Sequence, residues 1–378
     1  MIQLVLVLSA FGLALVFALV LNGWRTSVAE ALARKPADLV ANDKAPSLAL
    51  IIPVRNGEGT ITALLQDLYA GSLPDTTVMV VDDGSTDSTA ERVRSMLPRW
   101  PRLQLIPCNG TGKKAAITTG VHASDADWIL VTDADARCGP ERAQRIMQHV
   151  IGTGDDLVIM PVATDGEGLL GGLQENEQAA LMMCAAGTAL EGHPVLANGA
   201  NLAFRRRAFL DVQGYSGDRH ASGDDIFLVQ RMLRAGKRVG YCADPGVIVR
   251  VRAEPTWSAF VQQRLRWAGK MRSLPWRSLA MPAIGLLLPW SFVAITFGID
   301  WPRMVGSRFL MGALLLMGAW FIYLNAVTIL VRDGQRFVGQ RSSPLGAWLS
   351  YSAFALYAPV LAFASLFWKP EWKGRRIH

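Results

Sequence analysis

Four long, uncharged runs of apolar residues stand out along the chain: 1–24, 278–299, 309–331 and 342–368. At about 1.5 Å per residue, each run is long enough as a helix to approach the roughly 30 Å hydrocarbon core of a bilayer. The pattern predicts an integral membrane protein with one N-terminal and two to three C-terminal transmembrane helices. About 250 residues of ordinary composition lie between the first two runs, which is enough for one large domain with its own core.

From residue 47 the pattern changes to short apolar runs that alternate with amphipathic segments. Residues 47–54, 77–81 and 128–132 have the pattern of buried strands, and residues 60–70 that of an amphipathic helix. This alternation is typical of an α/β fold with a mainly parallel sheet. The predicted organisation is an anchor at 1–24, a linker at 25–46, an α/β domain at 47–272 and a membrane region at 273–378.

The net charge of +7 does not require a nucleic acid partner. The positive residues concentrate in residues 250–277, just before the second apolar run, where they suit anionic headgroups or a phosphate-bearing substrate. No interleaved basic and aromatic groove motif accompanies them, so the sequence predicts no nucleic-acid partner. The cysteines, which form no Cys-x-x-Cys and indicate neither a zinc site nor a disulfide framework, are Cys108, Cys138, Cys184 and Cys242.

The charges that flank the apolar runs predict the topology only in part. No Lys or Arg precedes the first run, whereas Arg25 and Arg34 follow it, which favours a cytoplasmic domain. If all four runs span, the carboxyl tail lies outside, although it is basic. Since Pro282 and Pro289 each remove a helix hydrogen bond, 278–299 is a candidate for a broken, re-entrant or interfacial segment, and the tail would then be cytoplasmic.

Two acidic clusters directly follow predicted strands, at the edge where open α/β sheets bind their ligands. Asp133 and Asp135, spaced i and i+2 after residues 128–132, offer hard oxygens to a divalent cation that also bridges a diphosphate. Asp82 and Asp83 can accept hydrogen bonds from a base or ribose, or the segment can be a turn and a helix cap. The chemistry of the two clusters favours a nucleotide-sugar site.

The order of the motifs resembles that of family 2 glycosyltransferases. The segments IIPVRNGEGTI, VVDDGSTDST, TGKKAAITTG and TDADA are followed by NGANLAFRR, SGDDIFLVQRML and QRLRW, over residues 47–272. The resemblance implies the GT-A fold and an inverting, nucleotide-sugar-dependent enzyme. The Gln-Arg-x-Arg-Trp subtype is similar to membrane-bound polysaccharide synthases and sphingolipid glucosyltransferases.

The resemblance also implies roles for individual residues. Asp135 and Asp133 would hold the divalent cation, Mg²⁺ or Mn²⁺. Asp225, the second acid of the Asp224-Asp225 pair, would be the catalytic base, since an inverting displacement needs one base at the acceptor hydroxyl. The donor-binding residues would be Asp82, Asp83, Lys113, Lys114, Asp133, Gln263, Arg264, Arg266 and Trp267. The acceptor site would include Asn198, Gly199 and Asn201.

Some of these motifs also have a purely structural interpretation. Arg264 and Trp267 can anchor an amphipathic helix at the membrane interface, and one of the paired acids at 224 and 225 can cap a helix. A glycosyltransferase-like scaffold without turnover is a further alternative, but all the acidic and cationic motif residues are present, which favours an enzyme. The expected donor is a UDP-sugar, and the expected acceptor is a membrane lipid or a lipid-linked glycan. The alternative within the enzyme class is a processive polysaccharide synthase.

Overall fold

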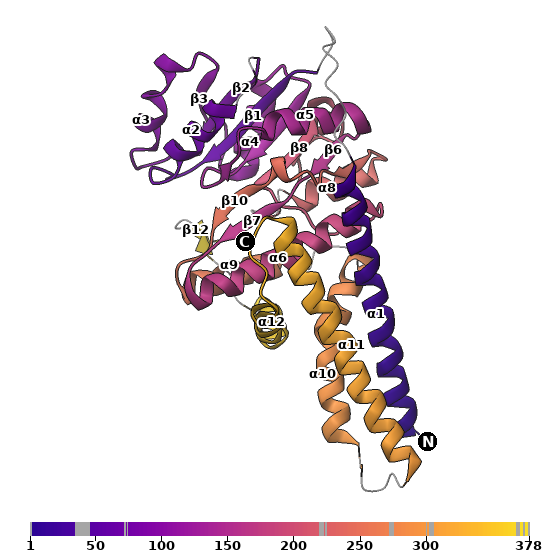
Figure 1. Ribbon diagram of the computed structural model, residues 1–378. Coiled ribbons are helices and arrows are strands. Elements are labelled where there is room, and N and C mark those ends of the chain that lie inside the picture. Colours follow the sequence, from indigo (N-terminus) through magenta and orange to yellow (C-terminus); the bar gives the residue numbers. More distant parts are fainter. Residues whose placement is uncertain are drawn as a thin grey trace.

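An α/β domain lies at one end of a bundle of long helices (Figure 1). The computed structural model describes residues 2–34, 46–71, 73, 75–218, 223, 225–271, 276–299, 301, 306–367, 371–372 and 375–376. The amino terminus lies at the far end of the bundle, and the carboxyl terminus lies near the domain.

The domain is built on a seven-stranded sheet with the order β3-β2-β1-β4-β8-β6-β9. Four neighbouring strands are parallel: β3 (Leu103–Pro107), β2 (Thr77–Asp82), β1 (Leu48–Val54) and β4 (Trp128–Thr132). Next to them, β8 (Asn201–Arg205) is antiparallel to both β4 and β6 (Leu157–Ile159), while β9 (Val239–Tyr241) is parallel to β6. The predicted α/β fold with a mainly parallel sheet is confirmed.

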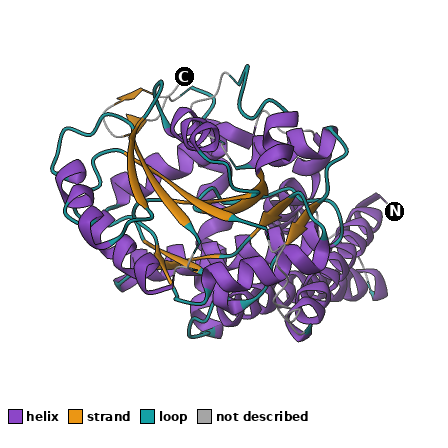
Figure 2. Ribbon diagram, turned by 90° about the horizontal axis from the view of Figure 1, so that it is seen from above, coloured by secondary structure: helices purple, strands orange, loops and turns teal. Residues whose placement is uncertain are grey.

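Helices cover both faces of this sheet (Figure 2). One face packs against α2 (Ile61–Gly71), α3 (Thr89–Arg94) and α5 (Arg142–Thr153), and the other against α4 (Lys113–Ala123), α6 (Gly168–Leu190), α7 (Arg206–Asp211) and α8 (Ile226–Arg234). In β1, Leu50 and Ile52 face the first group, while Ala49 and Ile51 face the second. Since side chains alternate along a strand, a strand buried on both faces is apolar throughout.

A second, three-stranded sheet lies beside the carboxyl edge of the main sheet, in the order β5-β10-β7. Its strands are β5 (Arg137–Cys138), β10 (Val249–Arg252) and β7 (Val162–Asp165). Because β5 begins directly after Asp133–Ala136, the small sheet holds that loop from one side, and the chain leaving β10 leads into α9 (Trp257–Met271).

Among the described residues, four helices are long and apolar enough to cross a membrane, as predicted: α1 (Ile2–Ala33), α10 (Trp276–Gly298), α11 (Ser307–Phe337) and α12 (Pro344–Ala364). Figure 1 shows α1, α10 and α11 running side by side away from the domain, whereas α12 is seen end-on and lies across them. Contacts of α12 with α6, α9 and α11 agree with this position. Beyond α12 the structure describes a turn at residues 365–367 and a short hairpin, β11 (Glu371–Trp372) and β12 (Arg375–Arg376).

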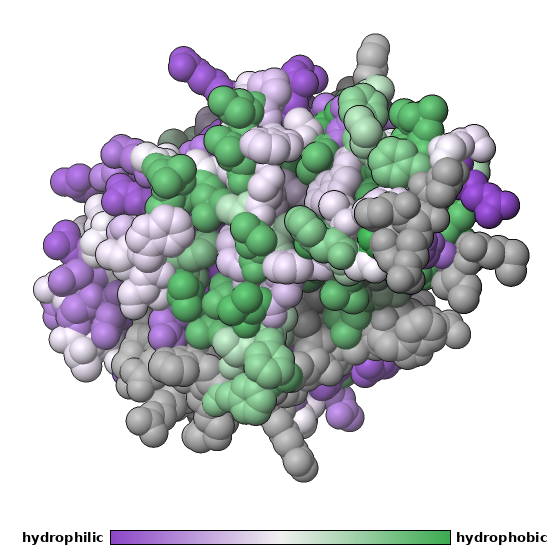
Figure 3. Space-filling view, turned by 90° about the horizontal axis from the view of Figure 1, so that it is seen from below, coloured by the Kyte–Doolittle hydropathy of each residue, from purple (hydrophilic) through white to green (hydrophobic). Residues whose placement is uncertain are grey.

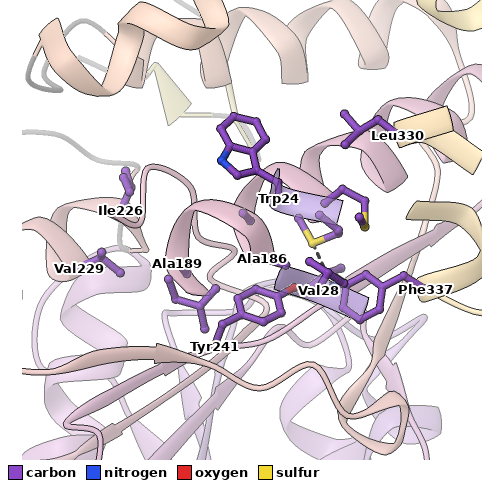
Figure 4. Close-up of a cluster of buried hydrophobic side chains, with 14 of the residues drawn as sticks. Trp24, Val28, Ala186, Ala189, Ile226, Val229, Tyr241, Leu330 and Phe337 are labelled. Carbon is purple, nitrogen blue, oxygen red and sulfur yellow. Dashed lines mark hydrogen bonds between the residues drawn. The ribbon is translucent and has the colours of Figure 1, made fainter. Parts of the chain in front are cut away.

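The first helix is longer than the predicted anchor and enters the core of the domain. It continues through Ala33, so residues 25–33 of the predicted linker are helical, since no Pro or Gly interrupts them. Trp24 packs against Gly187 of α6, where a Cβ atom would lie 2.2 Å from the Trp24 Cβ. Figure 4 shows Trp24 and Val28 gathered with side chains of α6, α8 and α11. The bundle and the domain therefore share one apolar core.

The interpretation of 278–299 as a broken segment is wrong, because α10 is continuous despite its prolines. Pro289 cannot donate to the carbonyl of Gly285, but the hydroxyls of Tyr323 and Tyr351 donate to that oxygen at 2.6 and 3.1 Å. In α12, Pro359 frees the carbonyl of Ala355, which accepts from Trp290 Nε1 at 3.0 Å. Donors from neighbouring helices thus replace the lost backbone bonds, as in other membrane helices that contain proline.

Candidate active site

The first acidic pair lies where β2 ends, facing the loop after β1 and the start of α4. The Asp83 carboxylate is buried and accepts a hydrogen bond from the amide of Gly112 at 2.9 Å. Gly112 has φ +92°, a conformation that favours glycine, and it immediately precedes α4. Asp82 is half-buried, and its carboxylate accepts from the amide of Ser85. Both acids therefore lie at the predicted sheet edge, where they also hold the turns in place.

The second acidic pair follows β4, the neighbour of β1. Asp133 is half-buried and forms an ion pair with Lys113 at 2.8 Å, while Asp135 is exposed. Lys113 is the first residue of α4, so the same helix that borders Asp83 also reaches Asp133. This brings Asp83, Lys113 and Asp133 together at one edge of the sheet.

A buried cation that the sequence did not reveal supports this loop from behind. Arg142 is wholly buried at the start of α5 and donates to Thr132 Oγ1 and Asn201 Oδ1, each at 2.8 Å. Burial lowers the pKa of its guanidinium. Because Thr132 directly precedes Asp133 and is paired with Asn201 across β4 and β8, Arg142 fixes the strand ends from which the acidic loop leaves. A charged residue at the start of an amphipathic helix gives no signal in the sequence that it is buried.

The two adjacent lysines, Lys113 and Lys114, contact different partners. The Lys114 ammonium pairs with Asp218 at 2.6 Å and lies over the rings of Tyr215 and Phe227, at 5.9 and 5.1 Å from their centroids. Consecutive helical residues are about 100° apart, so one lysine faces the acidic loop while the other faces the segment that leads to α8. The geometry brings Lys113, not Lys114, to the second acidic pair.

Asp225 lies at the start of α8 and is 9% exposed. Its carboxylate accepts from the amide of Ile226 at 2.7 Å, and Lys270 Nζ of α9 lies 3.6 Å from the same oxygen. Asp225 therefore also caps α8. Asp224 lies outside the described residues. Lys270 was not among the predicted site residues, although its spacing of four from Arg266 on one predicted helix could have indicated it.

The helix α9 carries the Gln-Arg-x-Arg-Trp motif and presents different residues to different partners. Burial lowers the pKa of Arg266, and the negative charges of Glu254 and Asp133 oppose this shift. Arg264 instead turns to α6, and the ring of Trp267 stacks on its guanidinium, 4.4 Å from the centroid. The side chain of Gln263 donates to Glu254 Oε1 at 2.8 Å.

The three predicted acceptor residues precede or begin β8. Asn198 is half-buried and its side chain accepts from the amide of Ala200, and Gly199 is buried. Asn201 is wholly buried, and its amide donates to the carbonyls of Pro161 and Val247 at 2.8 Å each. Since Arg142 donates to the Asn201 side-chain oxygen, both polar atoms of that side chain have hydrogen-bond partners within the fold.

Comparison with known proteins gives a family match, several relatives and a solved structure of similar fold. Residues 49–211 match the model of glycosyl transferase family 2. The succinoglycan biosynthesis protein ExoA of Rhizobium meliloti is 24% identical over 344 residues, which cover 87% of this chain and 96% of the relative. A poly-beta-1,6-N-acetyl-D-glucosamine synthase of Staphylococcus aureus is 23% identical over 60% of this chain, and the match spans 55% of that relative.

Among solved structures, a mannosyltransferase of Pyrobaculum calidifontis in complex with GDP-Man and Mn²⁺ has the same fold. It matches with a TM-score of 0.57 and 19% identity, over 94% of this chain and 98% of that one. The predicted GT-A fold is thereby confirmed. The chain is a glycosyltransferase that carries a family 2 domain of the GT-A fold, together with helices long and apolar enough to cross a membrane.

Proposed function

We propose that the protein is an inverting transferase that moves a sugar from a nucleoside diphosphate to a hydroxyl of a membrane lipid or lipid-linked acceptor. The observation that carries this proposal is the placement of cations beside the acidic residues: Lys113 lies 2.8 Å from Asp133, and α9 brings Lys270 to within 3.6 Å of Asp225. A cation thus lies beside Asp133, which would meet the donor, and another lies beside Asp225, which would activate the acceptor.

The carboxylates after β4 fit a divalent cation. Asp133 and Asp135 supply two hard oxygen ligands, and no cluster of three His, Cys, Asp or Glu side chains among the described residues could hold a metal alone. The donor diphosphate and water would complete the coordination, the usual arrangement for Mg²⁺ at phosphate sites. Bound there, the ion would neutralise charge on the leaving diphosphate. The mannosyltransferase solved with Mn²⁺ supports this assignment.

The remaining site residues have separate roles in an inverting displacement. Asp225 takes the proton of the acceptor hydroxyl as that oxygen attacks the anomeric carbon and the bond to the diphosphate breaks. Lys113 and Arg266 supply fixed positive charge toward the diphosphate, the kind of preorganised stabilisation that often dominates catalysis. Asp82 and Asp83 would bind the nucleoside, for which we retain uracil, with guanine as the alternative suggested by the GDP-Man complex.

A lipid acceptor fits the membrane region better than a polymer channel within one chain. Aromatic rings fill the space between α1, α10 and α11: Tyr323 packs on Phe17 at 5.5 Å and on Phe292 at 5.9 Å, and Phe292 packs on Trp320 at 5.1 Å. Seen from below, apolar side chains cover much of the centre of the molecule (Figure 3). The relative named as a poly-N-acetylglucosamine synthase keeps a processive polysaccharide synthase as the second candidate.

The test is sugar transfer by membranes that contain the protein, supplied in turn with radiolabelled UDP-sugars and GDP-sugars. We expect label in the organic extract with one donor, and none with Asp225→Asn membranes. Label confined to a water-soluble polymer would favour the synthase. No transfer beyond the Asp225→Asn background, from any donor, would contradict the enzymatic proposal.

We also propose that α1, α10 and α11 span the membrane, that α12 lies in its plane, and that the domain and tail are cytoplasmic. Tyr351 of α12 bonds to Gly285, which packs on Phe17, so α12 crosses the bundle near the domain end of the first apolar run. One face of α12 carries exposed large side chains: Leu345, Trp348, Leu349, Leu356, Val360 and Phe363. An apolar face opposite a face packed on protein suits a helix at the membrane interface.

Cysteine labelling tests this topology. In a variant without the four native cysteines, Ser307→Cys at the far end of the bundle should react with a membrane-impermeant thiol reagent in intact cells. Ile377→Cys in the tail and Ser342→Cys between α11 and α12 should react only after lysis. Reaction of Ile377→Cys before lysis, with Ser342→Cys still protected, would show that α12 crosses the bilayer.

A further inference from the structure

Among the described residues, a buried polar cluster outside the reaction centre joins α9, α6 and α12. Arg264 Nε lies 3.0 Å from each carboxylate oxygen of Glu177, and Nη2 lies 2.6 Å from Oε2. Both side chains are 6% exposed. The guanidinium lies between the rings of Phe260 and Trp267, with each centroid 4.4 Å away. A planar guanidinium held by a fork of bonds and two rings has almost no rotational freedom.

The same carboxylate also reaches the membrane region. The hydroxyl of Tyr357 in α12 donates to Glu177 Oε2 at 2.9 Å, and the Tyr357 ring packs on Phe260 of α9 at 5.5 Å. Glu177, from the middle of α6, is therefore the common acceptor for a motif arginine and a tyrosine 180 residues further along the chain. One side chain therefore joins α6, α9 and α12.

The anchored face of α9 is opposite the face that meets the reaction centre. At about 100° per residue, Arg266 and Lys270 point about 200° and 240° away from Arg264. A helix with its side chains has a radius of about 5–6 Å, so a rotation of about 10° moves their charged ends by about 1 Å. A displacement of this size can cost about 10²-fold in rate.

A buried ion pair is weak evidence for stability, because well-packed apolar residues can often replace it without loss of folding free energy. The best-attested role of such a pair is to fix the relative position of the elements that it joins. We propose that Glu177 is a positioning residue. By bonding to Arg264 and Tyr357, it fixes the rotation of α9 about its axis and links that rotation to the position of α12. The inference rests on the proposed function, since Arg266 and Lys270 are the groups being positioned.

The first experiment compares two tyrosines of α12. Tyr357→Phe removes the hydroxyl bonded to Glu177 and keeps the ring, and we expect kcat to fall about three- to tenfold with donor KM little changed. Tyr351→Phe is the matched control, because its hydroxyl bonds to Gly285 of α10 and not to α9. Equal kcat values for the two variants would overturn the link from α12 to α9.

The second experiment separates positioning from stability. Glu177→Gln should lower kcat by about 10- to 100-fold. The variant that combines Glu177→Met, Arg264→Met and Tyr357→Phe removes both charges and also the hydroxyl that would lose its acceptor, so its thermal unfolding should match the wild type while its kcat stays low. Recovery of normal kcat in this combined variant, or normal kcat in Glu177→Gln, would overturn the inference. If the wild-type protein itself transfers no sugar, the proposed function fails instead.

Discussion

Asp225→Asn should lower kcat by about two to four orders of magnitude, the usual cost of losing a general base, while donor binding changes little. Asn is nearly as good a helix N-cap as Asp, so the bond from the amide of Ile226 and the start of α8 should survive. The variant therefore removes the base and keeps the fold. Single-turnover transfer and nucleotide-sugar calorimetry on the same preparation measure both quantities.

Two controls exclude other causes of such a loss. Asp244→Asn changes another capping aspartate, which accepts from the amide of Gly246 and pairs with Arg145 instead of Lys270, and should transfer at the wild-type rate. In Asp225→Asn, the ammonium of Lys270 loses the carboxylate that lies 3.6 Å from it. The double variant Asp225→Asn with Lys270→Gln also removes this unpaired positive charge. Recovery of transfer in the double variant would show that the unpaired lysine, not the missing base, caused the defect. Lost donor affinity with normal transfer at saturation would place Asp225 in the donor site.

The sheet and its ligand edge could be predicted from the sequence because each depends on local patterns. Apolar runs such as 48–54 predict strands buried on both faces, and parallel strands bring the residues that follow them to one edge. This suffices to bring Asp83 and Asp133 together. The small sheet could not be predicted, since β5 has only two residues and pairs with a strand more than a hundred positions later.

The positions of individual side chains in the site depend on tertiary packing. The sequence offers Lys113 and Lys114 equally, and only the position of α4 on the sheet decides which one meets Asp133. Glu177 and Arg142 carry no motif, and their partners lie far away along the chain. Likewise, hydropathy indicates that α12 suits a membrane but not whether it spans it, because an interfacial helix and a spanning one can share a composition.

Removal of divalent cations should abolish transfer, and Asp135→Ala should lower it by at least about 10²-fold, since a pyrophosphate cannot bind beside two carboxylates without compensating charge. Addition of Mn²⁺ or Mg²⁺ after EDTA should restore the wild-type activity but not that of the variant. The exposed Asp75 lies before β2, at the opposite edge of the sheet, where it pairs with Arg102.

Asp75→Ala is therefore the matched control for Asp135→Ala, because it removes an exposed aspartate of the same domain without touching the acidic loop, and it should transfer normally. Binding of Mn²⁺, followed by electron paramagnetic resonance in the presence of the nucleoside diphosphate, should weaken in Asp135→Ala and not in Asp75→Ala. This readout does not depend on turnover, so it separates a lost ligand from a general defect. Near-normal transfer by metal-free enzyme would show that Lys113 and Arg266 alone neutralise the diphosphate.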